Sequence, residues 1–448
     1  MTKQEFKEAA EGILLLDGAT GSNLLKRGMP YGVCTELWVT EHPQVMKQLQ
    51  EEYISQGSNI IYAPTFSGNR IKLKEYGLLE RMEELNQGLV EISREASGGK
   101  ALVAGDITMT GAQLAPLGNL SFDELVDIYK EQIRLIVKAG VDLLVVETMM
   151  SLQETRAAVL AAREVCDLPI MATLSFQENK KTLYGVSAKA AAVVLQGLGV
   201  DAVGLNCSAG PDKMIEAVKE LVSFSCVPVI AKPNAGMPKL SKDHNTEYDM
   251  DAKTFAVHME ALLDAGASIL GGCCGSTPEF IGNVAEMVKG KHTVPARKHE
   301  ADRILLASER EVFAFVPGQK LSIGELIDFS VNEELVEEYQ EELFDTALDL
   351  AFDMEEEADI LRICTSAEGV AEEKAALAVA EELARNVNLP LMLASDSLDT
   401  ISYVLYHYSG IMAIQWNHNL EEWETQIKSM AKSYGVPIVT IDNEIIYC

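Results

Sequence analysis

Basic residues are scarce in this chain. Its 448 residues include 37 lysines and arginines against 68 aspartates and glutamates, which leaves a formal net charge of -31 at pH 7. Acidity of this size repels phosphate backbones and anionic lipid surfaces. We therefore expect no binding to nucleic acid or to a membrane surface, although acidity alone does not identify a partner.

Long hydrophobic runs are also missing. Apolar stretches such as 143–146 and 13–16 fall far short of the roughly 20 residues that a transmembrane helix needs. The N-terminal residues lack the apolar stretch of a secretory signal, and the eight cysteines follow no regular disulfide framework. The sequence therefore predicts a cytoplasmic protein in a reducing compartment.

What the chain does contain, up to about residue 291, is an alternation of short apolar runs with segments of helical periodicity. This alternation is typical of parallel strands joined by crossover helices. Eight runs are candidate strands: 13–16, 59–62, 101–104, 142–146, 169–174, 201–205, 227–231 and 268–270. Eight such units predict a (β/α)8 barrel of the TIM type over residues 1–290.

The rest of the chain has a different organisation. A basic, weakly patterned stretch at 291–302 predicts a linker. From 303 to 448, apolar runs again alternate with helical segments, so we expect a second, smaller α/β domain. It is too short for another complete barrel, which typically needs about 250 residues.

Polar residues follow the predicted strands of the barrel. In this fold, active sites are built from the loops at the carboxyl ends of the strands. Ten residues at or just after these ends are candidate site residues: Asp17, Gly18, Thr65, Asp106, Glu147, Asn206, Cys207, Asn234, Cys273 and Cys274. We expect them to converge on one site, although any one of them is equally well explained as an ordinary polar loop residue.

Two adjacent cysteines, Cys273 and Cys274, are framed by glycines directly after the eighth predicted strand. A disulfide between neighbours would strain the intervening peptide, whereas flanking glycines allow a turn that aims both sulfurs at one point. Cys207 ends the sixth predicted strand and should face the same mouth. Three thiolates leave one position open on tetrahedral zinc. The spacing therefore predicts a reactive zinc site.

A substrate thiol in the open position would be deprotonated by the metal and become a nucleophile at neutral pH. We therefore expect alkyl transfer to a substrate sulfur. The alternative is that the three cysteines are small buried residues or free thiols, because a vicinal pair plus a remote cysteine is less specific than two Cys-x-x-Cys pairs. The other five cysteines and the seven histidines show no metal-ligand pattern.

Five ordered motifs carry a resemblance to a known family. They are LLDGATGS at 15–22, APTF at 63–66, GLNCS at 204–208, KPNAG at 232–236 and GGCCG at 271–275. Together they resemble the homocysteine-binding domain of cobalamin-dependent methionine synthase, over essentially the whole first segment. The resemblance implies that Cys207, Cys273 and Cys274 bind zinc, and that homocysteine thiolate is the ligand that accepts a methyl group.

The resemblance also implies roles for the other residues at the predicted mouth. Glu147 is a candidate partner for the substrate ammonium, and the backbone around Asp17 and Gly18 is a candidate partner for its carboxylate. Four more residues are expected to line the pocket or orient ligands: Thr65, Asp106, Asn206 and Asn234. All of these except Glu147 are equally well explained as structural hydrogen-bonding groups.

The second segment resembles a shortened, degenerate form of the methyltetrahydrofolate-binding module of methionine synthase. The residues at 322–325 echo the start of that module, but Leu-Ile-Asp at 326–328 stands where the family continues Arg-x-Asn. Arg362 and Cys364 stand where the family carries an Asp-x-Asn pair for the pterin. A cation and a thiol cannot reproduce those hydrogen bonds, which argues against folate binding. No cobalamin-binding Asp-x-His-x-x-Gly segment is visible in the sequence.

We therefore expect a zinc-dependent homocysteine S-methyltransferase that forms methionine. The expected methyl donor is a methylcorrinoid protein supplied in trans, because the chain resembles a methionine synthase without its cobalamin module. Two alternatives stay open. The donor could be S-methylmethionine or betaine, although the enzymes that use them generally end soon after the double-cysteine motif. Alternatively, the protein binds zinc or a partner without catalysis.

Overall fold

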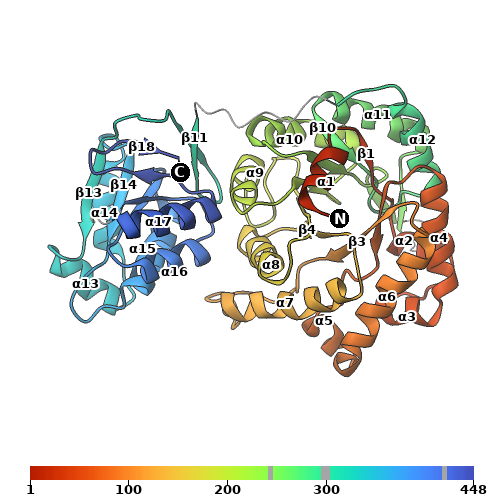
Figure 1. Ribbon diagram of the computed structural model, residues 1–448, viewed down its shortest axis with the longest axis horizontal. Coiled ribbons are helices and arrows are strands. Elements are labelled where there is room, and N and C mark those ends of the chain that lie inside the picture. The colour runs from red at the N-terminus through yellow and green to blue at the C-terminus, as the bar shows by residue number, and fades with distance from the viewer. Residues whose placement is uncertain (241–245, 294–302, 416–420, 448) are drawn as a thin grey trace. The chain divides into compact units, whose positions relative to one another are not determined.

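The computed structural model describes residues 1–240, 246–293, 303–415 and 421–447. The chain forms two compact units, one made of Met1–Ala188 and Val200–Lys298, the other of Lys189–Gly199 and His299–Cys448. Figure 1 shows the helices and strands of both units.

The first unit contains an eight-stranded parallel sheet that curls into a nearly closed barrel (Figure 1). In sheet order its strands are β1 (Leu14–Leu15), β10 (Ala267–Leu270), β7 (Val229–Lys232), β6 (Ala202–Asn206), β5 (Ile170–Leu174), β4 (Leu143–Met149), β3 (Leu102–Ile107) and β2 (Ile60–Ala63). A parallel bridge between Leu16 and Ile60 brings the two ends of the sheet together. The predicted barrel is confirmed, and each of the eight predicted strands overlaps an observed one.

Helices connect successive strands along the chain. The crossover helices are α4 (Pro43–Ser55), α6 (Met82–Ser97), α7 (Phe122–Lys138), α8 (Leu152–Val165), α9 (Ala188–Gly197), α10 (Pro211–Phe224), α11 (Ala252–Asp264) and, after the last strand, α12 (Pro278–Val288). The sequence of α7 shows why it forms. Ser121 and Glu124 make a capping box at its start, which satisfies free backbone N–H groups, and its apolar residues recur at helical spacing and are buried.

Shorter elements lie within the connections. They are α2 (Gly21–Lys26) and α3 (Thr35–Glu41) after β1, α5 (Arg70–Glu75) and the 3-10 turn η1 (Leu79–Arg81) after β2, and the hairpin of β8 (Pro238–Leu240) and β9 (Thr246–Tyr248) after β7. All of these connections follow the carboxyl ends of strands, so they are at the face of the barrel where the predicted site residues lie.

The amino-terminal half of the barrel interior is apolar. Helix α1 (Lys3–Ala9), capped by Thr2, contributes Phe6 to this region. The cluster contains Phe6, Ala10, Leu14, Leu16, Ile60, Tyr62, Ala104, Leu143, Val145, Met171, Ala202, Ile230 and Ile269. Because Leu14, Ile60, Leu143 and Ala202 are among the first residues of their strands, α1 packs against the amino end of the barrel.

The inner face becomes polar toward the carboxyl ends of the strands. Side chains alternate across a strand, so the residues two positions after an inward-facing residue share its face. Polar residues occupy these positions: Asp106 after Ala104, Glu147 after Val145, Thr173 after Met171, Asn206 after Gly204 and Lys232 after Ile230. Asn206 and Lys232 are also direct register partners on β6 and β7. The strand pattern therefore builds a polar layer directly above the apolar cluster.

The second unit is a curled, mixed half-barrel. Its sheet runs β13 (Ile323–Asp328), β14 (Ile360–Cys364), β15 (Leu391–Ala394), β16 (Ala413–Gln415), β17 (Ile438–Val439) and β18 (Ile445–Ile446), with only the last pair antiparallel. Within the described residues from 303 onward it also has five helices and a hairpin: α13 (Glu333–Gln340), α14 (Asp345–Met354), α15 (Glu372–Asn386), α16 (Leu398–His407), α17 (Glu421–Tyr434), β11 (Ile304–Ala307) and β12 (Val312–Phe315). The expected smaller α/β domain is confirmed.

The boundaries at 1–290, 291–302 and 303–448 stay a prediction, and most of the predicted linker lies outside the described residues. No described helix has both the length and the apolar character that a membrane crossing requires.

Truncating Phe6 should destabilise the barrel. The Phe6 side chain is 1% exposed within the apolar cluster, and replacing a buried phenylalanine by alanine typically lowers the free energy of unfolding by about 3–5 kcal/mol. Urea denaturation followed by circular dichroism measures the change for Phe6→Ala. Lys7→Ala, at an exposed position of the same helix, serves as the control and should shift stability by less than about 0.5 kcal/mol. Equal midpoints for the two variants would show that α1 does not stabilise the barrel.

Candidate active site

Three cysteine sulfurs converge at the carboxyl end of the barrel. Cys207 directly follows β6, and Cys273 and Cys274 follow β10. Their Sγ atoms all lie within 4.8 Å of one another, and none of the three forms a disulfide. Within the described ranges, this is the one group of three or more His, Cys, Asp or Glu side chains that could hold a metal ion. The convergence expected from the strand ends is therefore present.

The spacing of the sulfurs suits zinc. Zinc–sulfur bonds of about 2.3 Å at tetrahedral angles place two sulfurs about 3.8 Å apart, and Cys207 Sγ lies 3.7 Å from Cys274 Sγ. Hydrogen bonds from Cys207 and Cys273 lower the pKa of Cys274 to about 3. The same bonds, together with burial, raise the pKa of Cys273 well above its usual value.

The double-cysteine loop is held by the chain after β7. Cys273 N donates a hydrogen bond to Pro233 O at 2.6 Å, and Cys274 O accepts one from the same segment. Gly275 has a φ of +84°, and a Cβ there would lie 2.3 Å from the side chain of Tyr248. Only glycine combines this backbone conformation with so close a neighbour, which explains one of the glycines that frame the cysteine pair.

Cys207 also has an unusual backbone. Its φ is +59°, in the left-handed region that non-glycine residues rarely adopt. Cys207 N donates to Lys232 O at 3.3 Å, and Asn234 Nδ2 donates to Cys207 O at 3.0 Å. Backbone conformations of this kind persist when their surroundings hold them, and they cluster at functional sites. The segment that includes the end of β7 thus fixes all three cysteines.

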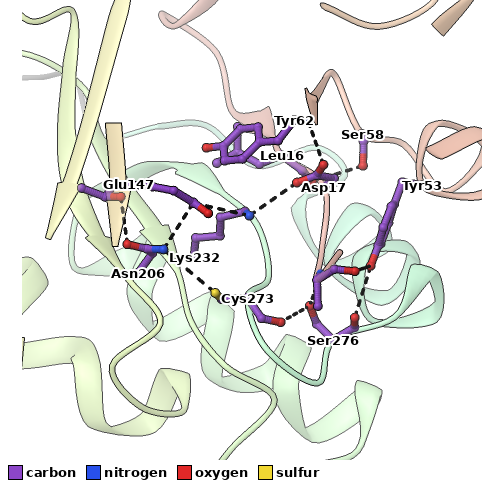
Figure 2. Close-up of polar contacts among 12 residues, drawn as sticks. Leu16, Asp17, Tyr53, Ser58, Tyr62, Glu147, Asn206, Lys232, Cys273 and Ser276 are labelled. Atoms are coloured by element: carbon purple, nitrogen blue, oxygen red, sulfur yellow. Dashed lines mark hydrogen bonds and ion pairs between the residues drawn. The ribbon is translucent and has the colours of Figure 1, made fainter. Parts of the chain in front are cut away.

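Asn206 connects the cysteines to the polar layer of the barrel. Its Nδ2 donates to Thr148 Oγ1 at 2.8 Å and to Glu147 Oε2 at 3.2 Å, and lies 4.0 Å from Cys273 Sγ. Its Oδ1 accepts from Thr148 N and Thr173 Oγ1, both at 2.9 Å. Figure 2 shows Asn206 between Glu147 and Cys273. The amide therefore fixes the position of the carboxylate relative to the metal-binding sulfur.

Three carboxylates and one ammonium are buried in this layer. Asp17, Asp106 and Glu147 are 1%, 6% and 6% exposed, and Lys232 is 4% exposed. Lys232 Nζ lies 3.5 Å from Asp17 Oδ1 and 3.7 Å from Glu147 Oε2, and 4.3 Å from the centre of the Tyr62 ring. Figure 2 shows the ammonium between the two carboxylates. The layer therefore holds three carboxyl groups and one ammonium group.

Burial governs the pKa values in this layer. It raises the pKa of the Asp17 and Glu147 carboxyl groups, although the charge of Lys232 opposes this rise. Burial and the charge of Glu147 together raise the pKa of Asp106 well above its usual value. Burial lowers the pKa of Lys232, but the charges of Glu147 and Asp17 outweigh it and leave that pKa well above the usual range. Lys232 is therefore a permanent cation.

Several buried oxygens of this site accept no hydrogen bond from the described protein. They are Asp17 Oδ1, Asp106 Oδ1 and Asn234 Oδ1. Buried acceptors normally have partners, because an unsatisfied one lowers stability. Asp106 Oδ1 and Asn234 Oδ1 are therefore acceptors without a partner in the described protein, whereas Asp17 Oδ1 faces Lys232 Nζ at 3.5 Å.

Two of the candidate residues have structural partners. Thr65 Oγ1 donates to Asp106 O at 2.8 Å and accepts from Asp106 N at 3.0 Å, which ties the end of β2 to β3. In the turn after β1, Ala19 N donates to Ser276 Oγ at 3.2 Å. A Cβ at Gly18 would lie 2.6 Å from the hydroxyl oxygen of Tyr53. Roles for Thr65 and Gly18 in ligand binding stay predictions.

Two side chains of the site were not among the candidates. Lys232 ends an otherwise apolar strand, and the alternation that starts at Ile230 would have placed it on the inner face. Tyr248 hydrogen-bonds the sulfur of Cys274 and packs over Gly275. No sequence pattern indicates a role for Tyr248, because only tertiary contacts bring the β8–β9 hairpin to the site.

Asp106 should make stability depend on pH. The pKa of the Asp106 carboxyl group is raised above the ordinary value of 3.8 in the folded protein. As the pH rises past 3.8, the unfolded chain releases the proton of Asp106 while the folded protein retains it. The free energy of unfolding therefore falls over this pH range. Asp106→Asn removes this loss. Its stability relative to wild type should grow from about pH 4 upward until Asp106 ionises in the folded protein. Urea denaturation across this range measures it, with the exposed Asp127→Asn as control. Parallel pH curves for Asp106→Asn and wild type would contradict the expectation.

Curated relatives match nearly the whole chain. Methionine synthase of Mycobacterium tuberculosis (strain ATCC 25618 / H37Rv) is 28% identical over 471 aligned residues, which cover 97% of this chain and 38% of that protein. Methionine synthase of Mycobacterium leprae (strain TN) is 28% identical over 429 residues, covering 90% of this chain and 35% of that protein. The chain thus spans little more than a third of the length of these relatives.

Solved structures match the barrel. The homocysteine methyltransferase MmuM from Escherichia coli, in its oxidized form, has a TM-score of 0.54 and 22% identity, and the match covers 64% of this chain and 99% of that one. Its metallated form gives a TM-score of 0.53 and 22% identity, with 63% and 99% covered. At this level of identity, the likeness shows the fold.

Residues 14–288 match the family model described as Homocysteine S-methyltransferase. This match covers more than half of the chain. It runs from the first strand of the barrel to the last crossover helix and includes all three cysteines of the metal-binding group. The chain belongs to the homocysteine S-methyltransferase family.

Proposed function

We propose that this protein forms methionine by transferring a methyl group to the sulfur of homocysteine held at zinc. The sulfur triad carries the proposal. Its three sulfurs lie within 4.8 Å of one another, and a tetrahedral zinc ion that they bound would have one position left for a ligand thiol. Membership of the family supports homocysteine as the acceptor. The methionine synthases among the relatives support methionine as the product.

Cys207, Cys273 and Cys274 would hold the ion, which lowers the pKa of a bound substrate thiol so that it reacts as a thiolate at neutral pH. Hydrogen bonds within the protein fix the positions of these cysteines. Asn234 holds the backbone of Cys207, and Asn206 fixes the distance between Cys273 and Glu147. A rigid shell of this kind keeps metal ligands in productive orientation.

The carboxylate layer supports an amino acid as the substrate. Asn206 contacts both Glu147 and Cys273, so a substrate whose sulfur lies at the triad has its other end beside the carboxylates. Glu147 is then an acceptor for its ammonium, together with Asp106 Oδ1, which has no partner in the described protein, and with Asp17, which also pairs with Lys232. An ammonium has three donors, and its charge reduces the excess negative charge of the layer.

We propose a methylcorrinoid protein, supplied in trans, as the methyl donor. The substrate thiolate would attack the methyl carbon in line. The sulfur–carbon bond would form as the bond between the methyl group and the corrinoid breaks, and the electron pair of that broken bond would stay with the corrinoid. Apolar side chains that lie exposed on the loops after the strands support a large partner. They are Tyr31, Val33, Leu117, Leu183, Tyr184 and Met237, between 37% and 78% exposed, and we call them the apolar rim. Exposed apolar groups of this kind mark interaction sites.

The second unit supports a donor other than folate. Arg362, at the position where the resembled module carries an aspartate, forms ion pairs with Asp328 at 3.2 Å and Glu325 at 3.6 Å. A guanidinium offers donors and no acceptor, so it cannot accept hydrogen bonds from a pterin. We therefore propose that residues 303–448 are a degenerate relative of the pterin-binding module, joined to the barrel of residues 1–290 by a linker at 291–302.

We also propose a cytoplasmic location. The described cysteines are all free thiols, and the proposed centre requires them in that state. Thiols persist in reducing compartments and are oxidised in secreted proteins.

Removing any one of the triad sulfurs should release zinc. The wild-type protein, loaded with zinc and freed of excess metal, is expected to retain about one ion per chain. Cys207→Ser, Cys273→Ser and Cys274→Ser should each retain far less, as measured by elemental analysis after a chelator wash. Cys166→Ser, a half-buried cysteine outside the triad, is the matched control and should retain zinc as wild type does. Full zinc retention by all three triad variants would exclude the proposed centre.

The donor can be identified by direct comparison. Methionine formation from homocysteine is measured with methylcobalamin, with a methylated corrinoid protein, with S-methylmethionine and with betaine. We expect turnover with both corrinoids, and we expect Leu183→Ser combined with Tyr184→Ser to lower kcat/KM about tenfold for the protein-borne donor, because exposed apolar anchors contribute to docking. Turnover of free methylcobalamin should not change. Methionine formation only from S-methylmethionine or betaine would exclude the corrinoid donor.

A further inference from the structure

Tyr248 contacts the double-cysteine loop with both its ring and its hydroxyl. It lies on β9, which pairs with β8 so that Tyr248 is opposite Pro238. A Cβ added to Gly275 would lie 2.3 Å from the ring of Tyr248, so the ring packs directly over this glycine. The phenol hydroxyl hydrogen-bonds the sulfur of Cys274. The hairpin thus brings one hydroxyl donor to one sulfur of the triad.

The residues around this tyrosine are bonded to the segment that also holds the cysteines. Met237 N donates to Asp249 Oδ1 at 2.8 Å, which joins β9 to the residue before β8. Met250 N donates to Ala235 O at 3.1 Å, and Ala235 N donates to Cys274 O at 2.9 Å. The position of the phenol is therefore fixed relative to the sulfur that it contacts.

The three sulfurs of the triad differ in their surroundings. Cys273 is 8% exposed, and its sulfur lies 4.0 Å from Asn206 Nδ2. Cys207 and Cys274 are half-buried. Within the described part of the chain, the sulfur of Cys207 hydrogen-bonds only the other two sulfurs, whereas that of Cys274 also has the hydroxyl of Tyr248. The hydroxyl thus contacts one of the two more accessible sulfurs.

The protein's own sulfurs would compete with the substrate for the methyl group. Cysteines that bind zinc are thiolates, and a thiolate is the nucleophilic form of the side chain. A phenol hydroxyl is a donor at neutral pH. A hydrogen bond that it donates to a thiolate stabilises the negative charge and must weaken before the sulfur attacks carbon. The hydroxyl of Tyr248 therefore makes Cys274 a poorer nucleophile.

We propose that Tyr248 is a positioning residue that suppresses methylation of Cys274 and so favours transfer of the methyl group to the substrate sulfur. This inference rests on the proposed function, because it takes the triad as a zinc site and methyl transfer as the reaction. Methylation of Cys274 would form a sulfur–carbon bond and convert an anionic metal ligand into a neutral thioether. A chain modified in this way would lose one of its three thiolates.

A small methyl donor tests the proposal without any substrate. Tyr248→Phe removes the hydroxyl and retains the ring that packs over Gly275. The zinc-loaded wild type and variant are treated with iodomethane, from which iodide leaves with the electron pair of its bond to carbon. Peptide mass spectrometry with fragmentation measures the methylation rate of each cysteine. Cys274 should be methylated about tenfold faster in Tyr248→Phe, because a charge-assisted hydrogen bond no longer opposes the attack.

Two controls separate this effect from a general change in the protein. Cys207 is the internal reference, because its sulfur has no hydroxyl donor among the described residues, and its rate should stay near the wild-type value. Tyr76→Phe removes the hydroxyl of an exposed tyrosine outside the site and should leave the rates of all three cysteines unchanged. Zinc content is measured for every protein before the reaction.

The outcomes distinguish this inference from the proposed function. Faster methylation confined to Cys274 supports the inference, whichever methyl donor the protein uses. An unchanged rate at Cys274 would overturn it. Equal increases at all three cysteines, or loss of zinc from Tyr248→Phe, would show that Tyr248 only maintains the metal centre and would also overturn it. Failure of zinc-loaded wild type to form methionine from homocysteine would contradict the proposed function alone, and wild type that retains no zinc would overturn both.

Discussion

The alternation of side chains along a parallel strand is the constraint on which this site depends. In a closed barrel, every second residue must enter one shared interior. Here the inward positions are apolar at the amino end, where Phe6 of α1 completes the packing, and polar at the carboxyl end. The polar residues can be buried there because the strands fix their mutual distances, and Asn206 then bonds to groups on β4, β5 and the loop after β10. The polar residues of the site thus lie on the same inward faces of the strands as the apolar residues that pack below them.

The buried polar layer has more carboxyl groups than ammonium groups, which is unusual for a protein interior. Three buried carboxyl groups face one buried ammonium, and burial is the largest cause of the raised pKa of each carboxyl group. A protein selected only for stability would replace such groups, since uncompensated buried charge is unfavourable. The layer becomes balanced when a cationic group joins it. With the proposed substrate bound, its ammonium would give these carboxyl oxygens a partner that the protein alone does not supply.

Much of this arrangement could be predicted from the sequence, and the exceptions have physical reasons. The eight strands of the barrel are continuous apolar runs because parallel strands covered on both sides are apolar throughout. In contrast, β13 has only Gly324 and Ile327 buried. Its sequence lacks a continuous apolar run, so this strand could not be recognised by that pattern. The cysteines could be placed from strand order alone, because all carboxyl ends meet at one face. The alternation from Ile230 places Lys232 on the inner face, although a lysine is usually exposed. Tyr248 could not be assigned from the sequence, because tertiary contacts position the hairpin that carries it.

The double-cysteine loop also joins the two ends of the barrel. Gly272 N donates to Asp17 O, and Gly275 N donates to Ser22 Oγ across 253 positions of sequence. The first strand of the barrel is thus bonded to the loop that follows the last one, at the same place where the sulfurs meet. During synthesis, Cys207 emerges long before its partners, and the site cannot exist until the final strand has closed the ring. An ion that binds only the assembled triad would favour the closed barrel over every open form. A metal ion bound by the three cysteines would then stabilise the closed barrel in addition to its role in the reaction.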